Sequence, residues 1–75
     1  MNLTKLEKNQ KAILTQIDGD GVTKRRLRSF GLDVGSQIEI KQKSIANANI
    51  EILCKQGLVA LRQNEAKMIT CEVVA

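Results

Sequence analysis

Apolar and polar residues alternate over several short stretches of the chain, which is the period-2 pattern of strands buried on one face. The clearest case is the stretch 37–43, where Ile38 and Ile40 alternate with Glu39 and Lys41. Comparable patterns predict further strands at residues 11–17, 50–54, 58–61 and 69–73. The sequence therefore predicts about five short strands.

Two of these stretches differ from simple alternation. Within 11–17, Ile13 and Ile17 fall on one face while Ala12 and Leu14 fall on the other, which predicts burial on both faces over part of the strand. Residues 58–61 contain little polar character, so we expect this strand to lie at the centre of its sheet.

One short basic helix is expected between the first two strands, from about Thr23 to Phe30. Leu27 and Phe30 lie three residues apart on one face, so both should point inward. Gly31 can take the left-handed conformation that ends a helix, with Leu32 folded back onto the last turn. Gly35 is expected to supply a positive φ in the turn that follows.

The remaining segments predict shorter features. Leu3 and Leu6 should pack one turn of helix onto the core, and residues 55–57 should connect two strands as a hairpin. Residues 44–49 form a polar loop in which Asn47 can take a positive φ. Asn64 is a candidate cap for a helical turn over residues 64–67.

Together these elements predict a mainly β fold of about five strands with one α-helix inserted after the first strand. The 75 residues suffice for one domain, which would span residues 1–75. Small all-β proteins with short strands close into barrels to remove their edges. A small β-barrel is therefore the expected architecture.

Net charge narrows the range of partners. The chain carries a formal charge of +4 and has a sequence pI of about 9.4, which suits a nucleic acid, an anionic membrane face or an acidic protein. No apolar run reaches the roughly 20 residues of a membrane span, and the N-terminus lacks the apolar core of a signal peptide. We expect a cytosolic protein in which Cys54 and Cys71 stay reduced.

The residue inventory argues against catalysis and against a cofactor. The chain has no His, Tyr or Trp, and its carboxylates are too scattered for acid–base work. Cys54 and Cys71 share strand faces with Ile or Val and are expected to be small buried hydrophobes. Two thiols without histidine fall short of a structural zinc site. No enzyme activity, cofactor or metal site is predicted.

The basic helix is the strongest candidate for a binding surface. Lys24, Arg25 and Arg28 are the cations we assign to its partner-binding face, and Leu32 and Val34 are the apolar neighbours. The alternative is that cations near a helix C-terminus merely complement its dipole, which explains Arg28 better than Lys24. Nucleic acid would lack a stacking platform, because Phe30 is the only aromatic residue and points inward.

Two motifs carry a resemblance to a known family. Arg25-Arg26-Leu27 followed by Gly31-Leu32-Asp33-Val34-Gly35, and later Val59-Ala60-Leu61-Arg62 with Glu65-Ala66, resemble FeoA, the small ferrous iron transport protein A. The resemblance runs from Leu3 to Val73. The chain departs from the family pattern at Val34, which stands in place of Pro, at Asn9, which stands in place of Gly, and in the loop 45–49, which lacks the usual Pro, Leu and Gly.

The resemblance implies an SH3-like β-barrel with a helix after the first strand, a fold shared with the C-terminal domain of diphtheria-toxin-repressor-type metalloregulators. It also implies a cytosolic accessory or regulatory role in ferrous iron uptake beside FeoB, the permease with a cytosolic GTP-binding region. Arg25, Arg26 and Arg28 would then meet an acidic or phosphate-bearing surface of that partner, and one arginine could act as a finger in GTP hydrolysis. Membrane association would be indirect, through the permease.

Two other functions stay open at this point. A nucleic-acid-binding small β-barrel would use the same positive charge and would show a steep salt dependence. A weak homo-oligomer would instead pair the exposed strand edges of two copies.

Overall fold

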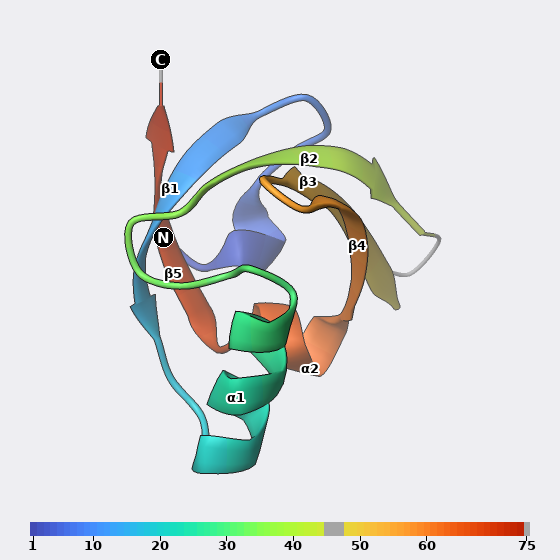
Figure 1. Cartoon of the computed structure of the whole chain (residues 1–75). Helices are drawn as coiled ribbons and strands as arrows, with labels where there is room; N and C mark the ends of the chain where they lie inside the picture. Colours follow the sequence, from blue (N-terminus) through green and yellow to red (C-terminus); the bar gives the residue numbers. More distant parts are fainter. Residues whose placement is uncertain (45–47, 75) are drawn as a thin grey trace.

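The computed structural model describes residues 1–44 and 48–74. One antiparallel sheet with the strand order β4-β3-β2-β1-β5 curls into an incompletely closed barrel (Figure 1). The predicted mainly β fold, with one α-helix after the first strand, is confirmed. In chain order the elements are η1 (Leu3–Lys5), β1 (Lys11–Ile17), α1 (Gly21–Ser29), β2 (Gln37–Lys43), β3 (Asn49–Cys54), β4 (Gly57–Arg62), α2 (Gln63–Ala66) and β5 (Ile69–Val74).

The hydrophobic core lies inside the curled sheet. It consists of the side chains that point inward at alternate positions along the strands. Ile38 and Ile40 of β2 are buried, as are Ile50 and Ile52 of β3, while their sequence neighbours face outward. Leu3, the first residue of the 3-10 turn η1, and Leu6, its C-cap, are also fully buried, which confirms their predicted packing on the core. Both cysteines are buried and free, as expected.

Strand β1 is buried on one face only, so the prediction of burial on both faces is wrong. Ala12 and Leu14 are buried, whereas Ile13 is exposed to solvent. The pairing register with β5 shifts between Leu14 and Gln16, and after that bulge Ile17 lies opposite the buried Ile69. A bulge inserts one extra residue and redirects the side chains that follow. Period-2 counting along the sequence cannot anticipate that change.

Strand β4 lies at an edge of the sheet, so the prediction that residues 58–61 form a central strand is also wrong. It pairs with β3 through a connection of two residues, Lys55 and Gln56, which confirms the predicted hairpin. Its outward Leu58 is 60% exposed. The low polarity of this stretch therefore reflects an apolar outer face rather than burial on two sides.

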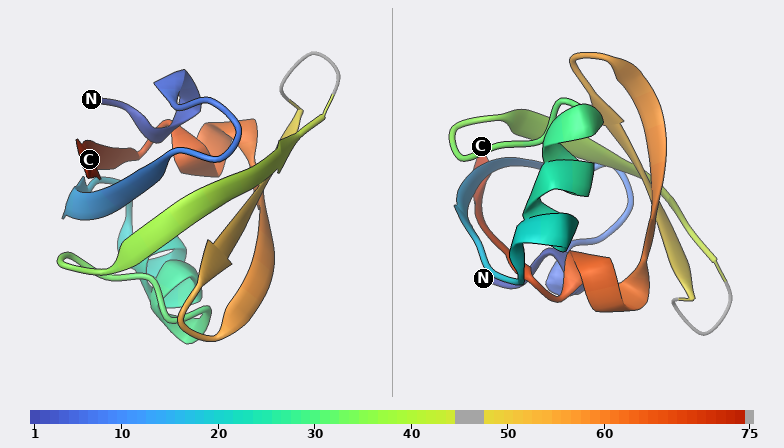
Figure 2. Two further views of the ribbon diagram at one scale, coloured as in Figure 1. Left: turned by 90° about the horizontal axis from the view of Figure 1, so that it is seen from above. Right: turned by 60° about the horizontal axis from the view of Figure 1, so that its bottom comes forward.

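Helix α1 lies across one end of the barrel, where it covers the gap between β5 and the hairpin of β3 and β4 (Figure 2). It starts two residues before the predicted Thr23, because the side chain of Asp20 accepts a hydrogen bond of 2.8 Å from the backbone N–H of Thr23 and caps the helix. Leu27 is its one fully buried residue. Phe30, predicted to point inward, is the C-cap and only partly buried against the core.

The helix ends in the predicted glycine turn. Gly31 has φ +84°, its N–H donates to the carbonyl of Arg28, and the N–H of Leu32 donates to the carbonyl of Leu27. These two bonds form a Schellman motif, which folds Leu32 back under the last turn. Leu32 is fully buried beside Leu27 in the same core.

The shorter predicted features have mixed outcomes. Helix α2 is capped at Arg62 rather than at Asn64, because the Glu65 carboxylate accepts a bond of 3.1 Å from the Arg62 backbone N–H. Asn9 has a positive φ, the conformation for which the family's Gly would be suited. Gly35 also has a positive φ, as predicted. Asn47 lies outside the described residues.

Replacing Leu27 by Ala is expected to destabilise the protein more than replacing Phe30 by Ala. Loss of the fully buried Leu27 removes the anchor of α1 and should cost about 2–5 kcal/mol, whereas truncating the only partly buried Phe30 leaves a smaller cavity. Chemical denaturation of both variants measures the difference. A larger loss for the Phe30 variant would show that the ring, not Leu27, holds the helix to the barrel.

Candidate functional site

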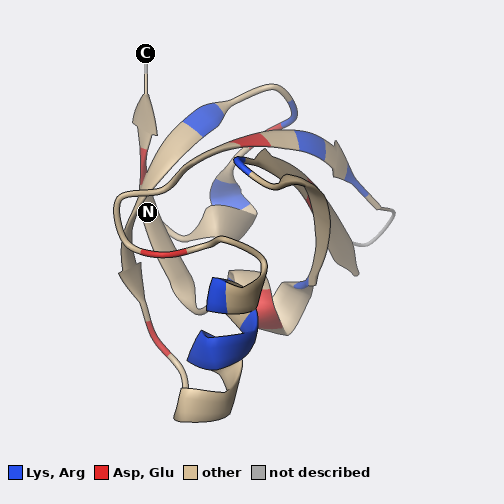
Figure 3. Cartoon of the chain, viewed as in Figure 1, with Lys and Arg blue, Asp and Glu red and all other residues tan. Residues whose placement is uncertain are grey.

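Positive charge concentrates on α1, which carries four of the twelve Lys and Arg residues of the chain within five positions (Figure 3). These residues are Lys24, Arg25, Arg26 and Arg28. The buried Leu27 fixes how the helix is rotated against the barrel, so each cation has a defined direction. Their surroundings differ, and the differences divide them into three groups.

Arg26 faces helix α2 rather than a prospective partner. Its Nε lies 3.1 Å from the Glu65 carboxylate, whose side chain is only 10% exposed. Its guanidinium also lies over the ring of Phe30, 5.6 Å from the ring centroid. The ion pair and the cation–π contact both tie α1 to the rest of the domain. Arg26 therefore ties α1 to α2, and its place in the contact surface stays a prediction.

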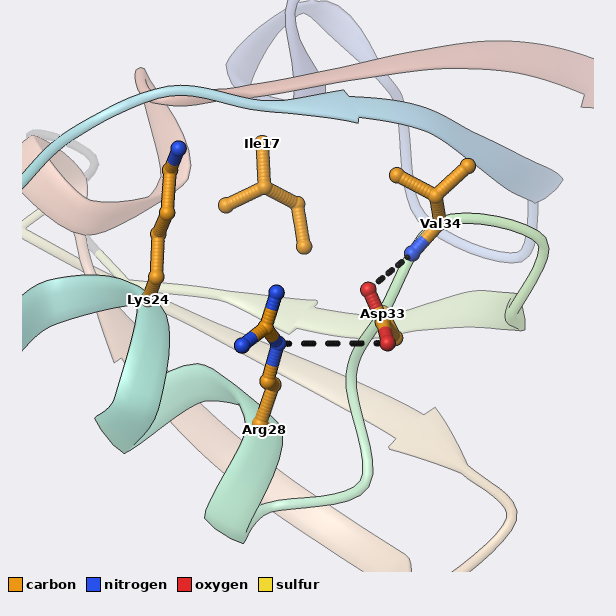
Figure 4. Close-up of a pocket in the computed structure, with 5 residues that line it drawn as sticks. All are labelled: Ile17, Lys24, Arg28, Asp33 and Val34. Atoms are coloured by element: carbon orange, nitrogen blue, oxygen red, sulfur yellow. Dashed lines mark hydrogen bonds and ion pairs between the residues drawn. The ribbon is translucent and has the colours of Figure 1, made fainter. Parts of the chain in front are cut away.

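Lys24 and Arg28 line a small pocket of about 170 Å³ together with Ile17, Asp33 and Val34 (Figure 4). Lys24 and Arg28 stand on successive turns of α1, so their side chains project from the same face of the helix. Ile17 comes from the end of β1, and Asp33 and Val34 come from the turn after Leu32. Three segments that are distant in the sequence thus meet at one opening.

The turn that carries Asp33 and Val34 is fastened to β1. The Gly35 N–H donates to the carbonyl of Leu14 at 2.7 Å, and the Leu14 N–H donates to the carbonyl of Ser36 at 2.9 Å. The Asp33 carboxylate accepts a bond of 2.8 Å from the Val34 N–H. Val34, at 59% exposure, is consequently held at the rim of the pocket beside Ile17.

Arg28 and Asp33 form a loose pair across the pocket. Arg28 Nε lies 3.9 Å from Asp33 Oδ2, and both side chains are well exposed. A pair with this geometry in water contributes little to stability. Figure 4 shows the two terminal nitrogens of Arg28 turned away from Asp33, toward the side where Ile17 and Lys24 lie. These donors are the ones that a ligand would meet.

The predicted contact residues therefore fall into those that line the pocket and those that do not. Lys24, Arg28 and Val34 come together at the pocket, while Arg25 is exposed on the helix outside it. Leu32 is wrong as a contact residue, because the Schellman turn buries its side chain completely. Ile17 and Asp33 were missed. Ile17 reaches the pocket through the bulge in β1, but Asp33, two residues before Gly35 in a turn motif, could have been noticed.

Two ionisable side chains, Asp20 at the start of α1 and Cys71 in β5, have shifted pKa values. Hydrogen bonds from the backbone and side chain of Thr23 hold the pKa of the Asp20 carboxyl below its usual value. Burial raises the pKa of the Cys71 thiol, which opposes thiolate chemistry there.

Within residues 1–44 and 48–74, no three His, Cys, Asp or Glu side chains gather as a metal site would require. No helix in the same residues is long and apolar enough to cross a membrane.

The sequence matches a known family over nearly its whole length, since residues 1–73 fit the family model of the FeoA domain. The chain belongs to the FeoA family. A Campylobacter jejuni protein, provisionally named Fe(2+) transport protein A, is 32% identical over 74 residues, which cover 99% of this chain and 100% of that protein.

Solved structures agree with this FeoA assignment. The FeoA protein from Chlorobium tepidum superposes with a TM-score of 0.92 at 29% identity, over 100% of this chain and 71% of that one. A manganese-dependent transcriptional repressor superposes with a TM-score of 0.90 at 17% identity, over 99% of this chain and 36% of its own length. The second similarity concerns the fold alone, and the SH3-like fold implied by the resemblance is confirmed.

Replacing Asp20 by Ala should lower the thermal midpoint at neutral pH by removing the cap of α1. Because the folded-state pKa of Asp20 lies below the usual value of an unfolded aspartate, its contribution is fully present above that usual value and is lost as the pH falls through the folded pKa. The difference between parent and variant should therefore shrink in acid. An Asp20→Asn variant keeps an acceptor and serves as the control; a difference independent of pH would contradict the assignment.

Arg26→Gln is expected to destabilise the protein by about 1–3 kcal/mol, since it leaves the nearly buried Glu65 carboxylate without its cation. Arg25→Gln, its exposed neighbour on the helix, should change stability by less than about 0.5 kcal/mol. Urea unfolding of the two variants makes the comparison. Equal effects would mean that the contact with α2 does not hold α1 in place.

Proposed function

We propose that this FeoA-family protein is an accessory protein of ferrous iron uptake that binds the cytosolic part of the FeoB permease through helix α1. The contact surface comprises Lys24, Arg25 and Arg28 with Val34 beside them. The protein works in the cytoplasm and reaches the membrane through its partner. It acts by binding and regulation, in keeping with a chain that has no histidine for acid–base work.

The observation that carries the proposal is the way α1 distributes its cations. One of them, Arg26, is committed to Glu65, and this pair anchors the helix. Among the described residues Lys24 and Arg25 make no ion pair, and Arg28 makes only a long one. Like charges four residues apart, such as Lys24 and Arg28, slightly disfavour the helix. Their presence on one exposed face is therefore better explained by a partner than by stability.

Several features favour a protein partner over a nucleic acid. The exposed neighbours of the cations are aliphatic, with Val34 beside the pocket and Val22 on the first turn of α1. The single aromatic ring, Phe30, is occupied by Arg26 and packed against the core. Modules that bind single-stranded nucleic acid stack the bases on exposed aromatic rings, and the described residues offer none free for this. A rim of cations around aliphatic side chains is typical of a protein interface.

The test is a binding measurement with the purified cytosolic domain of the permease. The double substitution Arg25→Glu with Arg28→Glu should lower the affinity at least about tenfold while the thermal midpoint stays close to that of the parent. The loss should appear largely in the association rate and its salt dependence, because exposed charges steer encounter.

The matched control is Lys5→Glu with Lys8→Glu, which changes the net charge equally. Both lysines are exposed, Lys5 in η1 and Lys8 three residues later, and η1 lies on the side of the domain away from α1 (Figure 2). The control should bind like the parent. If the α1 variant binds as well as the control, the interface lies elsewhere, and equal losses would indicate general charge attraction rather than a defined surface.

A further inference from the structure

The pocket beside α1 has an unusual balance of charge for a basic surface. Lys24 and Arg28 supply two positive charges, and Asp33, in the facing wall, supplies one negative charge. The pocket therefore carries one net positive charge. A monoanion neutralises such a site. A phosphate group carries a charge of about −1.5 to −2, so the bound site would be net negative and the phosphate would be repelled by Asp33.

The donors in the pocket suit a carboxylate. Arg28 uses its Nε on the side of Asp33, while its terminal nitrogens face Ile17 and Lys24 (Figure 4). A guanidinium fork pairs with the two oxygens of a carboxylate through parallel hydrogen bonds. Lys24 adds an ammonium on the other side of the opening (Figure 4). A single carboxylate can thus be met by both cations.

The remaining walls are aliphatic. Ile17 lies between Lys24 and the turn, and the exposed Val34 stands at the opposite rim (Figure 4). Together they offer a small apolar surface directly beside the charged donors. A lone inorganic anion would leave this surface wet, whereas an amino-acid side chain next to the acidic one would cover it.

We infer that this pocket receives one Asp or Glu side chain of a partner protein, with an adjacent aliphatic side chain packed against Ile17 and Val34. The inference deepens the proposed function, since it rests on α1 being the surface that meets a protein partner. It also assigns different roles to the cations. Lys24 and Arg28 recognise the acidic residue, whereas Arg25 lies in the contact surface outside the pocket and does not contact that residue.

Short peptides test the pocket without the permease. The blocked tripeptide acetyl-Leu-Glu-Leu-amide is titrated into isotopically labelled protein at low salt, beside the same peptide with Gln or with phosphoserine at the centre. The Glu peptide should give saturable shifts at the backbone amides of Ile17, Lys24, Arg28, Asp33 and Val34. It should bind about tenfold more tightly than the Gln peptide and also more tightly than the phosphoserine peptide.

Variants of the protein sharpen the comparison. Arg28→Gln should abolish the preference for Glu over Gln, whereas Arg25→Gln should keep it. Asp33→Asn retains an oxygen that can accept from the Val34 N–H and removes the negative wall charge. It should therefore raise affinity for the phosphoserine peptide more than for the Glu peptide.

The outcomes separate this inference from the proposed function. Equal binding of the Glu and Gln peptides, shifts away from the pocket, or a preference for phosphoserine in the parent would overturn the carboxylate assignment, even if the permease domain binds normally. Saturable, Glu-selective binding at the pocket supports the assignment. If it is found while the parent shows no affinity for the permease domain, the choice of permease fails and the pocket chemistry stands.

Discussion

The position of helix α1 depends on one packing constraint, the burial of Leu27 and Leu32 together at the open end of the barrel. The two side chains can both reach the core because the chain reverses at Gly31, whose φ is +84°. A side chain at this position would be strained, and its Cβ would come within 2.9 Å of the Gln56 side chain. The glycine turn thus fixes the helix rotation and the start of the turn that carries Asp33 and Val34.

The direction of each cation follows from that constraint. With Leu27 inside, Arg26 falls beside α2 and pairs with Glu65, while Lys24 and Arg28 project over the end of β1. One arginine therefore stabilises the docked helix so that its neighbours can stay available for binding. The repulsion between Lys24 and Arg28, a few tenths of a kcal/mol, is small beside the apolar burial that holds the helix. The pocket is therefore a consequence of the way α1 packs across the end of the barrel.

The features that depend only on residues close together in the sequence could be predicted from it. Alternation located the strands, and the Gly31 and Gly35 turns were placed correctly, because positive φ is a requirement of single residues. Features set by tertiary pairing were missed. The bulge at β1 moved Ile17 to the pocket, and β4 took an edge despite its apolar sequence. Leu32 looked available beside the cations, but its burial depends on a Schellman turn packed against the whole core.

The central claim is that the pocket side of α1 is the surface that meets the permease, and its most direct test is a residue-by-residue map of the complex. Labelled protein is titrated with the unlabelled cytosolic domain of the permease while backbone amide signals are followed. The account predicts that shifts and line broadening concentrate on Ile17, on the exposed residues of α1 and on the turn at Asp33 and Val34. Changes confined to strand β4 or to the segment around Lys5 and Lys8 would contradict it.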